Sequence, residues 1–185
     1  MCGKLQRNSC RAFTLSELAV GIAVSSIILT ALLSFTVYGA KSFNAMSNYV
    51  DLEQKSQNAL DTMTSEVRQT RYLSNYLTKT LNGVTITNTL TFVDFDSQLL
   101  VYTFTNDVLL RRKAGTETML LTNVDYLNFG VFQRNTKTNS FDQFPTSDAP
   151  RCKVISVSWI CSRTILGSKM NTESVQTAKI VIRKQ

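Results

Sequence analysis

The stretch LAVGIAVSSIILTALLSFTVYGA, residues 18–40, contains no charged side chain. As a helix it would be roughly 34 Å long, enough to cross a bilayer core of about 30 Å. A helix is the only form in which a single segment can span lipid, because its backbone groups find no hydrogen-bond partner outside the segment. Three cations, Lys4, Arg7 and Arg11, precede this stretch, and the first twelve residues contain no acid. By the positive-inside rule, this charge bias predicts a cytoplasmic N-terminus and an extracytoplasmic C-terminal part.

The composition of the chain argues against catalysis. Its 185 residues include 20 Lys and Arg, 13 Asp and Glu and no His, for a formal charge of +7. Without His, His-based triads and most zinc sites are excluded, and the seven Gly form no phosphate-binding loop. No basic patch is interleaved with aromatic residues. We therefore expect no enzyme, no cofactor, no metal site and no direct contact with nucleic acid.

Glu17 immediately precedes the apolar stretch on its N-terminal side. A carboxylate at the edge of a membrane segment is a candidate functional residue, because burying its charge in lipid is costly. A structural interpretation competes with this one. Near the N-terminus of a helix and at the level of the lipid headgroups, the helix dipole favours an anion. The sequence leaves both interpretations open.

The segment RAFTLSEL, residues 11–18, followed by the apolar helix, resembles the processing motif of type IV prepilins and type II secretion pseudopilins. The resemblance implies that prepilin peptidase cuts the chain between Ala12 and Phe13, and that Phe13 then becomes the N-methylated first residue. It also implies that Glu17 is the carboxylate used in assembly. Where the family usually has Gly before the cut, this chain has Ala12, another small residue.

Between Ala40 and Gly83 there is no Pro and no Gly, which favours a continued helix from Thr14 to near Arg71. We assign residues 1–12 to a cleaved leader, 13–40 to a transmembrane or filament-core helix, and 41–80 to an extended amphipathic helix. Apolar residues at helical spacing predict a stripe that packs against a globular domain; they are Phe43, Met46, Val50, Leu60, Met63 and Val67. We expect Asp51, Glu53 and Lys55 to form a solvated face without a site.

From Gly83 onward the apolar pattern changes to a period of two, which is typical of half-buried antiparallel strands. Residues 81–185 are therefore predicted to be a β-rich globular domain, and the whole chain an α+β protein with a pilin-like order of elements. The predicted strands lie near 84–92, 100–104, 108–112, 119–121, 124–132, 153–161 and 178–182, with a turn at 105–107 and an exposed loop at 135–150.

Cys152 and Cys161 flank one predicted strand. Their odd spacing places them on opposite faces, about 30 Å apart in a straight strand, so we favour unpaired thiols. A bend in this segment would leave a disulfide open. Asp94, Asp96 and Asp107 lie without the regular spacing of a calcium loop, and we interpret them as turn residues.

The resemblance implies a structural minor pilin or pseudopilin of the bacterial inner membrane that later joins a filament. Its partners would be other pilin or pseudopilin subunits and prepilin peptidase. The apolar span lacks Pro, which favours a pseudopilin or minor pilin, and the layout of a long helix followed by strands resembles the J-type minor pseudopilin and equivalent minor pilins. The subunit could belong to a secretion system, a motility pilus or a DNA-uptake pilus, and the sequence does not distinguish these three. Two other interpretations remain: a secreted binding domain whose signal peptide is removed near Ala40, and a membrane-anchored binding domain that does not polymerise.

Overall fold

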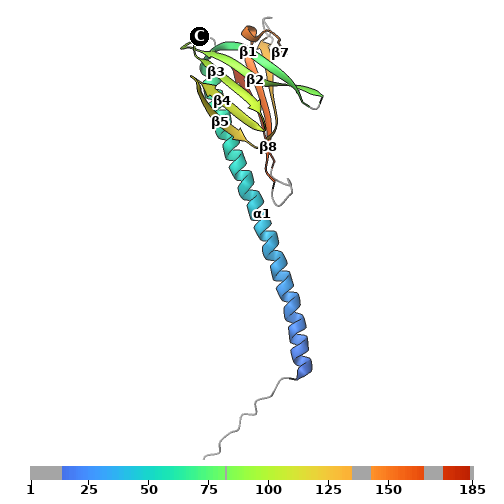
Figure 1. Cartoon of the computed structure of the whole chain (residues 1–185). Helices are drawn as coiled ribbons and strands as arrows, with labels where there is room; N and C mark the ends of the chain where they lie inside the picture. Colours follow the sequence, from blue (N-terminus) through green and yellow to red (C-terminus); the bar gives the residue numbers. More distant parts are fainter. Residues whose placement is uncertain (1–13, 82, 135–142, 165–172, 184–185) are drawn as a thin grey trace, which may run out of the picture. The chain divides into compact units, whose positions relative to one another are not determined.

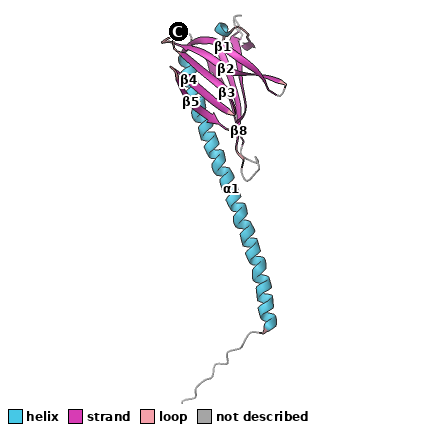
Figure 2. Cartoon of the chain, viewed as in Figure 1, coloured by secondary structure: helices cyan, strands magenta, loops and turns pink. Residues whose placement is uncertain are grey.

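The computed structural model describes residues 14–81, 83–134, 143–164 and 173–183. The chain forms two units, residues 1–43 and residues 44–185. Among these described residues, one long helix, α1 (Leu15–Gln69), has residues in both units, and the strands all belong to the second (Figures 1 and 2). One long helix followed by antiparallel sheets confirms the predicted α+β, pilin-like fold.

The buried face of α1 differs from the stripe that the sequence predicted. Leu52, Ser56, Ala59, Met63 and Val67 are buried, at spacings of three and four residues that place them on one side of the helix. The expectation was right for Met63 and Val67, and Leu60 packs partly against the core. It was wrong for the earlier members, since Phe43, Met46 and Val50 are exposed. Leu52, Ser56 and Ala59 were missed; the last two are not large apolar residues, and Leu52 lies outside the spacing of the predicted stripe.

The helix ends at Gln69, close to the predicted end near Arg71 and well before the boundary at residue 80. Residues 70–80, which we had assigned to the amphipathic helix, belong to strand β1 (Thr70–Leu81). Thr70 turns the chain, and its hydroxyl donates a 2.8 Å hydrogen bond to the carbonyl of Val67. The long pairing of β1 with β2 (Val84–Asp94) then outweighs local helix propensity.

The strands form two antiparallel sheets. The first has the order β1-β2-β3-β4-β5, so that each strand pairs with its neighbour in sequence. The second has the order β7-β6-β8-β9, which makes β7 and β9 its edge strands. The remaining strands are β3 (Leu99–Thr105), β4 (Val108–Lys113), β5 (Thr116–Thr122), β6 (Val124–Arg134), β7 (Gln143–Pro145), β8 (Val154–Ser162) and β9 (Glu173–Val181).

Most of the predicted strands are confirmed, and so is the turn at residues 105–107. Asn106 and Asp107 have positive φ angles of 49° and 59°, as a two-residue hairpin turn of type I′ requires. The predicted loop at 135–150 was partly wrong, because it contains the short strand β7 and a 3₁₀ turn at Ala149–Arg151. Residues 135–142 of that loop lie outside the described residues.

The core of the second unit joins the helix to both sheets. Met63 and Val67 of α1 belong to the same buried cluster as Tyr102 of the first sheet and Trp159 of the second. The rings of Phe92 and Tyr102 meet edge to face, with centroids 6.3 Å apart. One continuous core therefore ties residues 52–69 of α1 to the strands.

Candidate functional site

The first turn of α1 contains the candidate carboxylate, Glu17. Thr14 lies immediately before the helix and acts as its N-cap: its hydroxyl accepts a 3.3 Å hydrogen bond from the Glu17 amide. In return, one oxygen of Glu17, Oε2, accepts hydrogen bonds of 2.9 Å from both the amide and the hydroxyl of Thr14. This reciprocal arrangement is a capping box. The sequence signal for this cap is the pattern Thr-x-x-Glu before an apolar run, at residues 14–17.

The capping box supports the structural interpretation of Glu17 without excluding a second role. Its Oε2 atom is occupied within its own chain, whereas no hydrogen bond to its Oε1 atom is found among the described residues. Glu17 is exposed and lies in the first turn, where the helix dipole favours a negative charge. The predicted cleavage and methylation residues, Ala12 and Phe13, lie outside the described residues.

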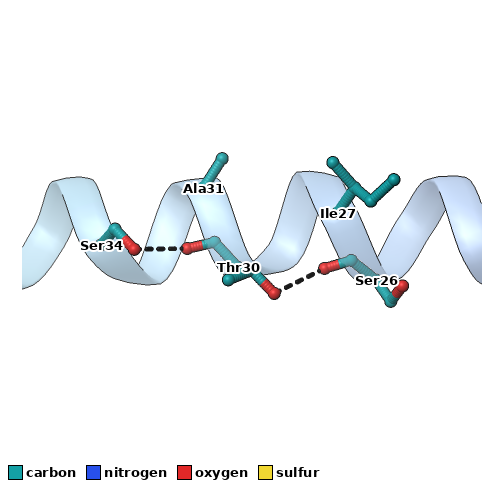
Figure 3. Close-up of a pocket in the computed structure, with 5 residues that line it drawn as sticks. All are labelled: Ser26, Ile27, Thr30, Ala31 and Ser34. Carbon is teal, nitrogen blue, oxygen red and sulfur yellow. Dashed lines mark hydrogen bonds between the residues drawn. The ribbon is translucent and has the colours of Figure 1, made fainter.

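Beyond Glu17, α1 is long and apolar enough to cross a membrane, and it is the one such helix in the described part of the chain. Its hydroxyl groups are satisfied within the helix. Thr30 donates to the carbonyl of Ser26 at 2.8 Å, and Ser34 donates to the carbonyl of Thr30 at 2.9 Å (Figure 3). With Ile27 and Ala31, these residues line one shallow side of the helix. Such side chains can enter lipid without leaving a polar group unpaired.

Asp51 and Glu53, which follow the span, have protein partners in addition to solvent. We had expected them to be solvated only. Asp51 makes ion pairs with Lys55 at 3.0 Å and with Arg163, beyond β8, at 2.7 Å. Glu53 accepts 2.7 Å hydrogen bonds from Ser174 and Gln176 of β9. The side chains of Lys55 and Asp51 are 52% and 43% exposed, so both stay in contact with solvent, as predicted. The contacts with Arg163, Ser174 and Gln176 were not predicted, because these partners are more than 100 residues away along the chain and local patterning carries no information about them.

A second polar link joins the C-terminal end of α1 to the first sheet. Arg111 of β4 holds both carboxylate oxygens of Glu66, with Nε at 2.7 Å from Oε2, and Tyr102 of β3 donates to Oε2 at 2.6 Å. Burial raises the pKa of Glu66, but the hydrogen bonds from Arg111 and Tyr102 outweigh it and hold the pKa below the ordinary value of 4.5. These three side chains fix the helix to the sheet.

The cysteines and the turn aspartates show no site. Cys152 and Cys161 are buried free thiols, and burial raises the pKa of Cys152 to about 11, so its thiol stays protonated and unreactive at neutral pH. Asp94 makes a 3.0 Å ion pair with Lys113. No group of three or more His, Cys, Asp or Glu side chains suited to a metal ion lies in the regions that the structure describes.

Comparison with known protein families also points to the N-terminal end of the chain, which contains Glu17. Residues 7–33 match the family described as the prokaryotic N-terminal methylation motif. No curated protein and no solved structure matches the chain. The chain therefore has the N-terminal motif of processed and methylated bacterial membrane proteins, at the start of a long apolar helix. The motif and the long apolar helix support a resemblance to type IV pilins and pseudopilins, in which this motif is structural rather than catalytic and implies processing by prepilin peptidase. The helix fits the single-pass inner-membrane anchor of a prepilin.

Proposed function

We propose that this chain is the precursor of a minor pilin or pseudopilin without catalytic activity of its own. Prepilin peptidase removes residues 1–12 by cutting between Ala12 and Phe13, and Phe13 is then N-methylated. The mature subunit enters a type IV pilus or a type II secretion pseudopilus. The single observation that carries the proposal is an acidic residue, Glu17, at the head of an uninterrupted apolar helix within the matched motif.

In this proposal the N-terminus of the precursor faces the cytoplasm, and residues 81–185 face the extracytoplasmic side. Lys4, Arg7 and Arg11 support that orientation. Residues 13–40 first span the membrane and then pack against the corresponding helices of other subunits. The move exchanges lipid for other apolar helices, so it is nearly neutral in hydrophobic free energy.

Cutting before Phe13 would create a positively charged amine four residues from Glu17. The amine of one subunit would pair with Glu17 of its neighbour, and its natural acceptor is Oε1, since Oε2 accepts hydrogen bonds from Thr14. A buried charge is tolerated only when it is paired, so the correct axial offset between subunits is stabilised over wrong ones.

Glu17→Gln tests this role more sharply than Glu17→Ala. Glutamine at this position preserves the capping box but lacks the negative charge. We expect the Glu17→Gln protein to insert in the membrane and to be cleaved, yet to be lost from purified filaments by a factor of at least ten. Glu117→Gln, at an exposed carboxylate of β5, is the matched control and should assemble normally. Normal assembly of Glu17→Gln would assign Glu17 to helix capping alone.

The N-terminus of the mature protein distinguishes the proposal from its alternatives. Mass spectrometry of the chain recovered from cells should find N-methylated Phe13 as the first residue. A start near Lys41 would indicate a secreted domain with a conventional signal peptide. An intact Met1 in cells that make filaments would indicate a permanent membrane anchor and would refute the proposal.

A further inference from the structure

The second sheet ends at an open edge formed by β9. Among the described residues β9 pairs with β8 only, so one side of its backbone has no strand beside it. The pairing of β8 with β9 runs from Val154 and Val181 to Ser162 and Glu173 without a register shift, so β9 is a regular edge. The unpaired backbone groups of such an edge are a template for another strand.

The other three sheet edges within the described residues differ from β9. β1 has three register shifts against β2, and β5 has one against β4. β7 has only three residues and ends in Pro145, which has no amide to donate. Bulges, short strands and proline are features by which proteins keep sheet edges from pairing with other chains. β9 has none of the three.

Two hydrogen bonds show which backbone groups of β9 point outward. The amide of Ser162, the last residue of β8, donates to the carbonyl of Asn123 beside β6 at 3.1 Å. The amide of Ile182, just past β9, donates to the carbonyl of Lys153 beside β8 at 2.9 Å. Because backbone directions alternate along an antiparallel strand, both bonds imply that the even-numbered residues of β9 bond to β8. The odd-numbered residues therefore direct their amides and carbonyls to the open edge.

The side chains of these odd-numbered residues are all exposed on one face of the strand. They are Glu173, Val175, Thr177, Lys179 and Val181. The set contains one charge of each sign, near opposite ends of the strand. Neither Glu173 nor Lys179 has an ion-pair partner in the part of the chain that the structure describes.

A second copy of β9, placed antiparallel along this edge, matches the two charges. When Gln176 lies opposite Gln176 of the other copy, Glu173 of each chain lies opposite Lys179 of the other, and the outward backbone groups face one another. Shifting the pairing by one step of the ladder keeps the backbone bonds but places Glu173 opposite Thr177 or Val181. Opposite charges directly across two strands stabilise their pairing, so the charges select one register.

We propose that β9 is a self-association edge, at which residues 173–179 of two copies of this chain pair antiparallel around a two-fold axis at Gln176. The two four-stranded sheets then become one continuous sheet. Each copy uses its single β9 edge, so the contact is closed and gives a dimer rather than a fibre. Ser174 and Gln176 donate 2.7 Å hydrogen bonds to Glu53 of α1, which hold β9 in place before it pairs. This inference goes beyond the proposed function and does not depend on it.

Charge reversal tests the register, in the full-length protein in detergent micelles. Lys179→Glu places like charges opposite each other at two points, and the dissociation constant of the dimer, measured by sedimentation velocity, should rise at least about tenfold. Adding Glu173→Lys exchanges both charges and should restore the wild-type constant. Lys79→Glu makes the same charge change at an exposed residue of β1 and should leave the constant unchanged. All these side chains are exposed, so the melting temperature should stay the same in each variant.

A disulfide across the two-fold axis identifies the partner as a second copy. In the proposed register the two Gln176 residues form a non-hydrogen-bonded pair, with Cα atoms about 4.5 Å apart, which a disulfide can span. Gln176→Cys, in a chain whose leader cysteines are replaced by Cys2→Ser and Cys10→Ser, should give a dimer on a non-reducing gel after oxidation with copper phenanthroline. Met119→Cys, an exposed position of the β5 edge, should stay monomeric.

Three results would overturn the inference. The first is a wild type that stays monomeric, and the second is the absence of a disulfide dimer from Gln176→Cys. The third is a dimer that Lys179→Glu leaves intact, because such a dimer is held by the apolar helix or another surface. The proposed function would stand in each case, since it depends on the N-terminal processing of the chain and on Glu17.

Discussion

Thr14 and Glu17 show how two residues define where the apolar helix begins. Each satisfies a backbone amide of the other, so the first turn of α1 has partners for donors that a helix end otherwise leaves unpaired. The same contacts hold one carboxylate oxygen in place and leave the other open to an incoming group. In the proposed assembly, a charge oriented in this way would need less reorganisation when its partner arrives.

At this scale we predict the effect of Thr14→Val, which has nearly the same shape but no hydroxyl. The helix start should fray, and amide hydrogen exchange of residues 15–18 in detergent micelles should rise roughly fivefold, as is typical for the loss of an N-cap. Thr14→Ser keeps the hydroxyl and should exchange like the wild type. Equal exchange in all three proteins would show that the capping box does not stabilise the first turn.

Among the elements, the connection between the end of α1 and the first sheet depends on a half-buried ion pair. The side chains of Glu66 and Arg111 are 14% and 19% exposed, and Tyr102 completes the carboxylate's hydrogen bonds. Since the pKa of Glu66 is lowered in the folded protein, the folded state stabilises the charged form. This contribution is present above the ordinary pKa of 4.5 and is lost as the pH falls through the lower folded value.

We therefore predict that Glu66→Gln lowers the free energy of unfolding by about 2 kcal/mol at pH 7, between the values for exposed and buried pairs. The difference from the wild type should shrink as the pH is lowered below 4.5. Urea titrations at several pH values measure it. Glu117→Gln removes an exposed pair with Arg112 and should change stability little at any pH. A pH-independent difference for Glu66→Gln would contradict the role of its charge.

The hairpin turns give a further prediction for single elements. Ala114 and Asn106 occupy equivalent first positions in the β4–β5 and β3–β4 turns, with φ angles of 51° and 49°. Alanine is strained at positive φ, whereas asparagine tolerates it. Ala114→Asn should stabilise the fold by about 1 kcal/mol and raise the melting temperature by about 3 °C. Asn106→Ala should destabilise it by a similar amount, and changes of the same sign in both would refute the argument.

On the scale of the whole molecule, the two units differ in what they need in order to be stable. Every buried hydrophobic residue of the described chain lies between Leu52 and Ile182, within the second unit. The first unit has no described buried residue of its own, and its apolar side chains are exposed. The second unit is thus an independent folding unit, while the first depends on its surroundings.

We predict that a chain starting at Asn44 is soluble and folds without residues 1–43. Its near-ultraviolet circular dichroism should show the packed environment of Trp159, and its thermal unfolding should be a single cooperative transition. Ala59→Asp, which places a charge in the shared core, is a control that should abolish the transition. Aggregation or a molten state of the Asn44–Gln185 fragment would show that the first unit contributes to folding.

The sequence by itself determined the features that local patterns encode. The uncharged run at 18–40 defined the apolar helix, and period-two alternation at Leu100, Tyr102 and Phe104 or at Ile155, Val157 and Trp159 identified strands whose inward residues are indeed buried. The Glu17 motif was visible because cleavage and assembly signals are short, contiguous strings. The roles that the resemblance assigns to Ala12, Phe13 and Glu17 stay predictions.

Only the tertiary structure decided which side of the helix after Lys41 packs and where the helix ends. Phe43, Met46 and Val50 are as apolar as Met63, so composition could not separate an exposed patch from a buried stripe. The ion pairs of Asp51 and Glu66, and the pairing that converts Thr70–Leu81 to strand, join residues far apart in sequence. Burial and partnership are properties of the folded chain as a whole, so the sequence pattern alone did not contain them.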